Sequence, residues 1–568
     1  MRLPLGSRWN FIQASYIIDT FSFGHNRLSK LQSILPLTLL SLLLFLPGIA
    51  NLPVIDRDEA HFAQASRQML QTGNYFQIRF QDKTRFQKPP GINWLQAASV
   101  RLFSNADATT IWPYRVPSLL GGLFSVLLLY FFARHFVNQG TALLASGLFT
   151  TSLLLIVETH MAVIDASLLF SVLLMQGALW HCYEKGIVGE RVHWGWAFCF
   201  WLALSFGMVL KGVTPLVGFL TVSALCLFER RVAWLQGLRL CRGFLLFLLL
   251  TLGWVYMVNN AEHSNYLMQM LHRDLLPKLQ GGHESHGKPP LFHLLILPLT
   301  FWPASLFLWH AGVYASRWHH EKTVKFLLAW LIPTWLFFEI MPTKLPQYVL
   351  PTFPAIALLC ALAIDSSKQE PLPGKWLHFL QIMWGVLSIG LASSFMILPY
   401  LVLGKIPAVS IVLFCGIVIL TVASVYFSWY GAYRKSSIAI LAAALITYPL
   451  LFGQLLPQLK PAWLTRNVIE LVKAEEITVA KPLLVAGFEE PSLVFNLNTK
   501  LVKFLDSASV EQLLKTDSSR AALVNSTVLK DWEKKGLRLS IKAHVAGYNY
   551  TKGRWLELVL VTQQKESK

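Results

Sequence analysis

Long apolar segments alternate with short polar ones over the first 456 residues of the chain. A helix needs roughly 17 to 25 apolar residues to cross a bilayer. Thirteen segments meet this description: 31-53, 113-133, 141-158, 161-183, 194-210, 212-228, 243-258, 291-312, 326-341, 347-365, 377-400, 406-428 and 437-456. The pattern predicts a polytopic α-helical membrane protein with about 13 transmembrane helices.

The pattern changes in the last part of the chain, where charged residues are spread throughout. Short strand-like runs begin near residues 482, 521, 537 and 555. A helix is expected over 526–535, with Ser526 as its N-cap and Gly536 just past its end. We therefore expect three parts: a basic cytoplasmic N-terminus (1-30), a membrane domain (31-456) and a small extracytoplasmic α/β domain (457-568).

The distribution of basic residues predicts the orientation. Arg2, Arg8, Arg27 and Lys30 precede the first apolar segment and should stay in the cytoplasm. Alternation from that start places most later clusters of bases on the same side. It places four segments on the opposite, outer face: 54-112, 259-290, 341-347 and the C-terminal part.

Composition agrees with a membrane protein, because 54% of the 568 residues are hydrophobic and only 14% are charged. The formal net charge is +19. Bases spread over the loops of a membrane protein contact anionic headgroups, so nucleic acid is not an expected partner. The six cysteines form no CxxC motif and are expected to serve in packing.

Three acids follow the first apolar segment at once. Asp56 and Glu59 have the spacing of a capping box, and a helical stripe follows at Phe62, Ala65, Ser66 and Met69. This spacing predicts an amphipathic helix on the membrane surface, with Asp58 on its buried stripe. One interpretation is that the acids only complement the positive end of the helix. The other is that Asp58 has a chemical role, because a carboxylate facing an apolar side is costly.

Two further ionisable residues interrupt apolar segments. Asp165 lies about one turn inside the fourth segment, where a charge costs about 2.5 to 3.5 kcal/mol and is functional by default. The alternative is a buried ion pair with His160 or with a base of the first outer loop. Lys211 divides a continuous apolar run and is expected to mark a tight turn on the outer face.

Acids and bases thus converge on one face from several loops. A carboxylate at the boundary of lipid and water can act as a general base toward a hydroxyl. Lys and Arg can hold a phosphate and stabilise it as it leaves. Glycosyl transfer from a lipid-linked phosphosugar has these requirements.

Several motifs also carry a family resemblance. RDEAHF (57–62) and VIDASL (163–168) resemble the acidic motifs of the protein O-mannosyltransferases. FQKPPGINWLQA (86–97) and KLPQY (344–348) resemble the bacterial aminoarabinose (lipid A) transferases of the same superfamily. Those transferases have Arg-Tyr where this chain has His61-Phe62, and Glu where it has Gln87. The resemblance covers roughly residues 50 to 360.

The resemblance implies a GT-C fold and a bacterial inner-membrane enzyme with its site on the periplasmic face. It implies an undecaprenyl- or dolichyl-phosphate sugar donor, inverting transfer without a metal, and an acceptor such as lipid A, a glycan or a protein. By motif, Asp58 is the expected base, with Glu59 and Asp165 as further catalytic acids. The expected donor-phosphate and substrate contacts are His61, Arg85, Lys88, Lys211, Lys278, Lys344 and Tyr348.

Other interpretations stay open at this stage. His283, Glu284 and His286 are the only candidate metal ligands, with His61 as a possible fourth, but their Gly-rich loop fits an acceptor-binding segment equally well. A flippase or transporter of a charged lipid would also need intramembrane acids and bases. Against it, the ionisable residues cluster on one face and no inverted repeat is apparent. An O-antigen ligase-like enzyme would share the lipid donor.

Overall fold

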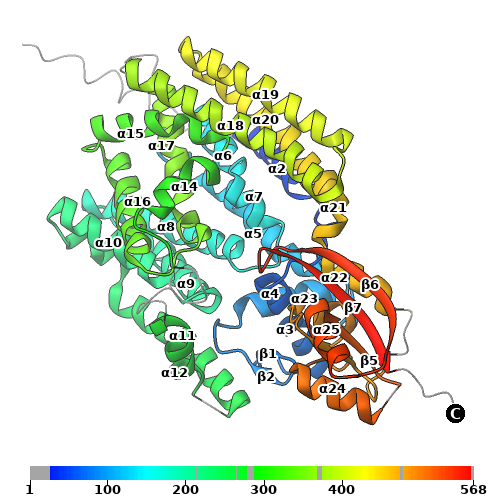
Figure 1. Cartoon of the computed structure of the whole chain (residues 1–568). Helices are drawn as coiled ribbons and strands as arrows, with labels where there is room; N and C mark the ends of the chain where they lie inside the picture. The colour runs from blue at the N-terminus through cyan, green and yellow to red at the C-terminus, as the bar shows by residue number, and fades with distance from the viewer. Residues whose placement is uncertain are drawn as a thin grey trace, which may run out of the picture.

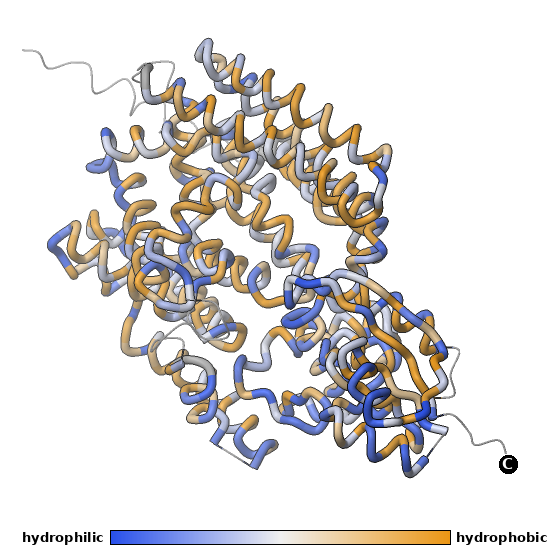
Figure 2. Tube along the Cα trace, in the orientation of Figure 1, coloured by the Kyte–Doolittle hydropathy of each residue, from blue (hydrophilic) through white to orange (hydrophobic). Residues whose placement is uncertain are grey.

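The structure is a computed structural model that describes residues 26–212, 214–263, 265–277, 287–366, 374–473, 477–517 and 519–563. Helices fill most of it, and a smaller unit with a β-sheet lies at the C-terminal end (Figure 1). The apolar helices and the more polar C-terminal unit are also distinct in hydropathy (Figure 2). The predicted combination of a helical membrane domain and a C-terminal α/β domain is confirmed.

Each of the thirteen predicted apolar segments coincides with a helix or a bent helix pair. Eight spans are long and apolar enough to cross a membrane: α5 (Trp112–Ala133), α8 (Asp165–Ile187), α11 (Leu240–Glu262), α16 (Lys322–Ile340), η6 with α17 (Pro346–Thr352 and Phe353–Ser366), α18 (Gly374–Leu403), α19 (Ala408–Trp429) and α20 with its continuation η7 and α21 (Tyr433–Leu450, Leu451–Leu455 and Leu456–Gln458). Three shorter apolar helices are α2 (Asn26–Phe45), α9 (Trp194–Leu210) and α10 (Thr214–Glu229).

Two predicted segments are bent rather than straight. Helices α6 (Gln139–Thr150) and α7 (Leu153–Thr159) meet at 64°, and α14 (Phe292–Thr300) meets the segment of η5 (Ala304–Phe307) and α15 (Leu308–Arg317) at 116°. Ser152 separates the first pair, and its hydroxyl donates to the carbonyl of Phe149. Side-chain bonds of this kind compete with the helical ladder and favour a bend.

The helices differ in how much of their surface the protein itself covers. Helices α5, α8 and α17 are largely buried, whereas α11, α18 and α19 leave most of their apolar residues exposed. In a protein without lipid such large apolar surfaces would be unstable, so these outer helices are the ones that face the bilayer. The ion pairs and the cavity described below lie in the inner part of the bundle.

The first outer loop folds into its own small structure. It contains α3 (Asp58–Thr72), a two-stranded antiparallel ribbon of β1 (Arg79–Phe80) and β2 (Lys83–Thr84), and α4 (Gly91–Phe103). The described part of the other outer loop contains α12 (Tyr266–Met270) and η3 (Leu271–Leu275). A further short helix, η2 (Ala233–Leu238), connects α10 to α11.

The C-terminal unit is a five-stranded mixed sheet in the order β4-β3-β5-β7-β6. Its strands are β3 (Leu483–Ala486), β4 (Val502–Phe504), β5 (Ala521–Asn525), β6 (Leu539–Asn549) and β7 (Arg554–Gln563). Strands β4, β3 and β5 are parallel, and β7 runs antiparallel to both β5 and β6. The 3-10 helix η8 (Lys460–Ala462) leads from the membrane domain into this unit.

Helices cover both faces of this sheet, which explains its apolar strand sequences. Residues of α22 (Leu464–Val472) and α23 (Pro491–Leu497) pack on one face, and residues of α24 (Ser507–Thr516) and α25 (Ser526–Lys534) on the other. The N-cap of α25 is Asn525, whose side chain accepts from the N–H of Val528, so the prediction of Ser526 as the cap was wrong by one residue.

Candidate active site

Helix α3 begins at Asp58 with Arg57 as its N-cap, one residue later than the capping-box interpretation assumed. The stripe of Phe62, Ala65, Ser66 and Met69 is buried, as predicted. Asp58, however, is exposed at the first position of the helix, and Glu59 is buried in its place. Asp58 and Glu59 lie four and three residues before Phe62, so both are about one turn from the stripe, and only Glu59 turns toward the core. The prediction that Asp58 faces the apolar side was wrong, and its carboxylate is accessible.

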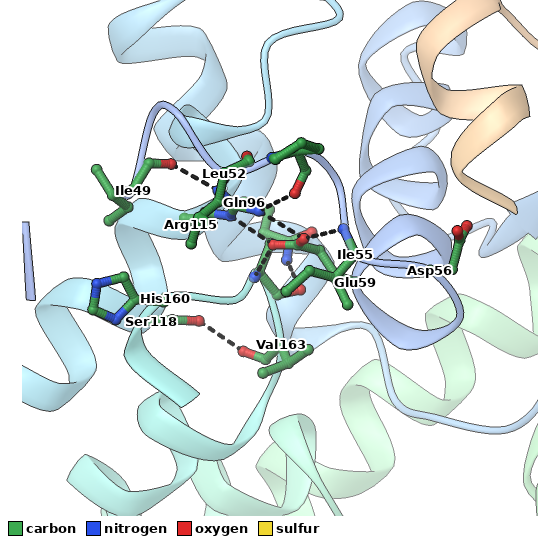
Figure 3. Close-up of polar contacts among 12 residues, drawn as sticks. Ile49, Leu52, Ile55, Asp56, Glu59, Gln96, Arg115, Ser118, His160 and Val163 are labelled. Atoms are coloured by element: carbon green, nitrogen blue, oxygen red, sulfur yellow. Dashed lines mark hydrogen bonds and ion pairs between the residues drawn. The ribbon is translucent and has the colours of Figure 1, made fainter. Parts of the chain in front are cut away.

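Glu59 lies in a fully paired buried cluster (Figure 3). Its carboxylate accepts from Nε and Nη2 of Arg115 at 2.7 and 2.9 Å, and from the backbone N–H groups of Ile55 and Ala162, both at 2.7 Å. The side chains of Glu59 and Arg115 are both 0% exposed. Arg115 also donates to three backbone carbonyls of the preceding loop, those of Ile49, Leu52 and Pro53. With both oxygens occupied, Glu59 is suited to holding α3 against α5 rather than to moving a proton.

Asp56 does not cap α3, so the capping-box prediction was wrong. Its carboxylate lies away from the Glu59 cluster in Figure 3 and accepts from the backbone N–H of Ser492 at 2.9 Å. Its own backbone N–H donates to the hydroxyl of Tyr550 at 2.8 Å. Burial raises the pKa of Asp56 to about 7, and the charge of Glu490 acts in the same direction. The hydrogen bonds from Ser492 and Tyr550 only partly oppose this shift.

Asp165 forms a buried ion pair, but with a partner that the sequence did not suggest. It is the first residue of α8, and its Oδ1 lies 2.6 Å from Nζ of Lys211. His160, one of the predicted partners, hydrogen-bonds the carbonyls of Ile156 and Pro47 instead. Lys211 also lies over the ring of Tyr348, with Nζ 5.0 Å from the ring centroid.

The position of Lys211 follows from the local sequence. The apolar helices α9 and α10 leave only a short connection, and Lys211 follows α9 in extended backbone. The predicted tight turn is therefore confirmed. The turn brings the ammonium group of Lys211 to the N-terminal end of α8, whose first residue is Asp165.

A cavity of about 340 Å³ opens beside this pair. Four predicted site residues line it: Lys88, Asp165, Lys211 and Tyr348. The remaining lining is mostly apolar and comes from α8, α10, α12, α16 and the segment 341–351. Among its lining residues, Lys88 and Lys211 carry ammonium groups and Asp165 carries a carboxylate. An apolar cavity with a cationic end suits an amphiphile whose head is an anion.

Two contacts hold the Lys88 segment in place. The hydroxyl of Tyr266, a fully buried residue of α12, donates to the carbonyls of Lys88 and Arg85. Just beyond, Gly91 begins α4 so close to α9 that a Cβ would lie 2.6 Å from the carbonyl oxygen of Val209. A glycine is needed at this approach, because any side chain would push the segment away from the cavity.

Other predicted residues lie outside the lining of this cavity. The imidazole of His61 packs edge-on against Phe80 at 4.7 Å, and burial, reinforced by the charge of Arg85, lowers its pKa to about 3. The guanidinium of Arg85 lies over the ring of Phe62 at 5.5 Å. Lys344 is buried and donates to the carbonyl of Lys288 at 3.3 Å, which ties together two outer segments.

The candidate metal ligands cannot be placed. His283, Glu284 and His286, together with Lys278, lie outside the described residues. Within the described residues, no group of three or more His, Cys, Asp and Glu side chains is arranged to hold a metal ion.

Arg115 and Glu158 are among the buried ionisable residues that sequence reasoning missed. Arg115 belongs to the cluster of Glu59, and Glu158 in α7 has a carboxylate oxygen, Oε2, without a hydrogen-bond partner in the described part of the chain. Both lie inside segments predicted to cross the membrane. The rule that singled out Asp165, that ionisable residues inside a span are functional or paired, applies to them as well.

Known proteins resemble this chain in sequence and in fold. Residues 35–259 match the family model of the dolichyl-phosphate-mannose-protein mannosyltransferases. The undecaprenyl phosphate-alpha-4-amino-4-deoxy-L-arabinose arabinosyl transferase of Pseudomonas paraeruginosa is 28% identical over 326 residues, which cover 57% of this chain and 58% of the relative. The chain thus spans less than two thirds of the length of such curated relatives.

Two solved structures share the fold. ArnT from Cupriavidus metallidurans, bound to undecaprenyl phosphate, is 17% identical and superposes with a TM-score of 0.72 over 93% of this chain and 98% of its own. The oligosaccharyltransferase of Archaeoglobus fulgidus is 11% identical, with a TM-score of 0.50 over 93% of this chain and 74% of its own. The chain is therefore a multi-pass membrane protein with the GT-C glycosyltransferase fold, and its residues 35–259 are related to the dolichyl-phosphate-mannose-protein mannosyltransferases.

Proposed function

We propose that this protein transfers a sugar from a polyprenyl-phosphate donor to a hydroxyl or phosphate of an envelope acceptor, with inversion and without a metal. The observation that carries the proposal is the cavity beside Lys88 and the Asp165–Lys211 pair. Its apolar walls suit the polyprenyl tail, and its cationic end suits the phosphate. The names of the relative from Pseudomonas paraeruginosa and of ArnT bound to undecaprenyl phosphate support a donor of this class.

In the proposed reaction, Asp58 accepts the proton of the acceptor hydroxyl. The oxygen then forms a bond to the anomeric carbon of the sugar, and the bond from that carbon to the phosphate oxygen breaks. The electron pair leaves with the polyprenyl phosphate, whose charge Lys88 and Lys211 stabilise. Asp165 keeps Lys211 oriented toward the cavity, since their polar atoms are only 2.6 Å apart. Asp58 suits its role because its carboxylate is exposed, whereas that of Glu59 is fully paired.

The proposal extends to the side of the membrane on which transfer occurs, to the acceptor and to the class of sugar. We place the site on the periplasmic face of a bacterial inner membrane, because the positive-inside pattern puts the first outer loop there. The acceptor is a lipid such as lipid A, a glycan or a protein. The sugar stays open at the level of class, since His61, Phe62 and Gln87 depart from the aminoarabinose-transferase motifs.

The test uses purified protein in proteoliposomes, with a panel of radiolabelled undecaprenyl-phosphate sugars and membrane extracts as the source of acceptors. Transfer should survive treatment with EDTA. Asp58→Asn should lower transfer by about 10²-fold, the usual scale for losing a positioned base. Asp82→Asn, which changes an exposed acid of the same loop, is the matched control and should leave transfer unchanged. Movement of labelled lipid across the membrane without any sugar product would support the flippase instead.

A further inference from the structure

The C-terminal domain contacts the chain at the residues directly before Asp58. The hydroxyl of Tyr550, at the tip of the β6–β7 hairpin, accepts from the backbone N–H of Asp56 at 2.8 Å and donates to its carboxylate at 3.5 Å. The guanidinium of Arg57 donates to the carbonyl of Thr551 at 2.7 Å. Ser492 of α23 completes the junction through its bond to Asp56. Two consecutive residues before Asp58 are thus held by residues more than 430 positions later in the chain.

The backbone at this junction is strained. Arg57 has φ 68° and ψ −109°, a conformation that residues with a side chain rarely adopt. No side chain caps the end of α3 to hold this conformation. Such a conformation persists only when surrounding contacts determine it. Two sets of contacts surround this turn. Within the chain segment itself, the backbone N–H of Ile55 donates to Glu59 and that of His61 to the carbonyl of Arg57. The C-terminal domain adds the bonds to Tyr550, Thr551 and Ser492, which hold Asp56 and Arg57 from outside.

The same domain also holds the rest of α3. Arg67 donates to the carbonyl of Phe495 at 2.8 Å, and Gln64 donates to the hydroxyl of Thr499 at 2.7 Å. The ring of Phe495 is buried and packs edge-on against Tyr114 of α5 at 5.4 Å. Helix α3 is therefore fixed to the bundle through Glu59 and to the C-terminal domain along its length. At its N-terminal end, the bundle holds Glu59, and the hairpin tip holds the two residues before Asp58.

We propose that the C-terminal domain positions Asp58, and that Tyr550 and Arg57 are the positioning residues. The hairpin tip holds the strained turn, which sets the direction of the first residue of α3 and thereby the position of its exposed carboxylate. This inference rests on the proposed role of Asp58 as the base. It gives the domain a part in the reaction although its residues do not line the cavity.

The test compares Tyr550→Phe with Tyr548→Phe in the full-length protein. The first removes the hydroxyl at the junction and keeps the ring. The second makes the same change two residues earlier, at a side chain that packs against Trp555. We expect Tyr550→Phe to lower kcat about tenfold, with the donor KM within twofold of the wild type and an unchanged thermal midpoint. Tyr548→Phe should match the wild type in all three quantities.

Two further measurements separate positioning from a merely structural role. Hydrogen exchange should become faster at the amides of residues 56–61 in Tyr550→Phe and stay unchanged in α25. In the Asp58→Asn background, Tyr550→Phe should have no further effect on transfer, because the group that it positions is already lost. If Tyr550→Phe proves less stable, the exchange measurement still tests the positioning role, because it compares the amides of residues 56–61 with those of α25 in the same variant.

The outcomes are distinguishable from a failure of the proposed function. If Asp58→Asn keeps full activity, the proposed base is wrong. If Asp58→Asn is impaired but Tyr550→Phe has wild-type kcat and exchange, the positioning role is wrong. A tenfold loss in both the wild-type and the Asp58→Asn background would also overturn it, since Tyr550 would then act through another group.

Discussion

Replacing Glu59 by Gln should destabilise the protein rather than remove a catalytic group. The carboxylate accepts four hydrogen bonds, two of them from Arg115 and two from backbone N–H groups. A glutamine has one acceptor oxygen, so its NH2 group would face a donor and Arg115 would lose its counter-charge in a site with 0% exposure. Breaking a buried ion pair by removing one partner costs about 3 to 5 kcal/mol.

The lower end of that range applies because Arg115 keeps its three carbonyl acceptors. We therefore expect a loss of about 3 kcal/mol, on the order of 10²-fold in the folding equilibrium. The assay is unfolding in mixed micelles, followed by the reaction of the buried thiols of Cys182 and Cys360 with a dye. The other four cysteines, Cys199, Cys226, Cys241 and Cys415, are partly or fully exposed and are replaced by Ser beforehand.

Glu184→Gln is the matched control, because Glu184 lies 3.9 Å from Lys322 with 33% of its side chain exposed. An exposed pair of this kind contributes at most about 1 kcal/mol. The result that would refute the structural role is a Glu59→Gln protein as stable as the wild type whose transfer rate falls as far as that of Asp58→Asn. Glu59 would then have to be returned to the catalytic acids.

Three other predictions concern pH, the buried pair and close packing. The pKa of Asp56 is raised to about 7 in the folded protein. The protonated carboxyl therefore stabilises the fold fully below about pH 4, and this contribution is lost as the pH rises through 7. In thermal unfolding, Asp56→Asn should thus be more stable than the wild type at pH 8 and equally stable at pH 4. Lys211→Ala should lose donor use and about 3 kcal/mol of stability, because it leaves Asp165 as an unpaired buried charge. Adding Asp165→Asn should restore the stability but not the transfer, as unfolding and transfer assays would show. Gly91→Ala should lower the thermal midpoint, because its Cβ would meet the Val209 carbonyl at 2.6 Å.

The membrane fold could be predicted closely because hydropathy reports directly on burial in lipid. All thirteen segments coincide with apolar helices or bent pairs. The bends could not be predicted, since Thr151 and Ser152 are polar residues of a kind that many straight helices also contain. In the C-terminal domain, strand-like runs identified β3, β5, β6 and β7, whereas β4 has only three residues and left no pattern to recognise.

The sequence indicated which residues gather at the candidate site better than it indicated which of them form bonds with one another. Lys88, Asp165, Lys211 and Tyr348 do line one cavity. The bond between Asp165 and Lys211 joins two helices 46 residues apart, and nothing local in the sequence specifies such a partner. The prediction that Asp58 lies on the buried side of α3 was wrong, because periodicity cannot fix where a helix starts to within one residue.

The attachment of α3 to the C-terminal domain has a consequence for biosynthesis. The residues before Asp58 leave the ribosome long before Tyr550 and Thr551, because 494 positions of sequence separate these partners. Contacts of such separation form late in folding, since the intervening chain must first be ordered. The membrane helices can insert and pack during synthesis, but the turn before Asp58 stays without these contacts until the β6–β7 hairpin has been made. A chain truncated shortly before Tyr550 would thus insert into the membrane with its strained turn unsupported.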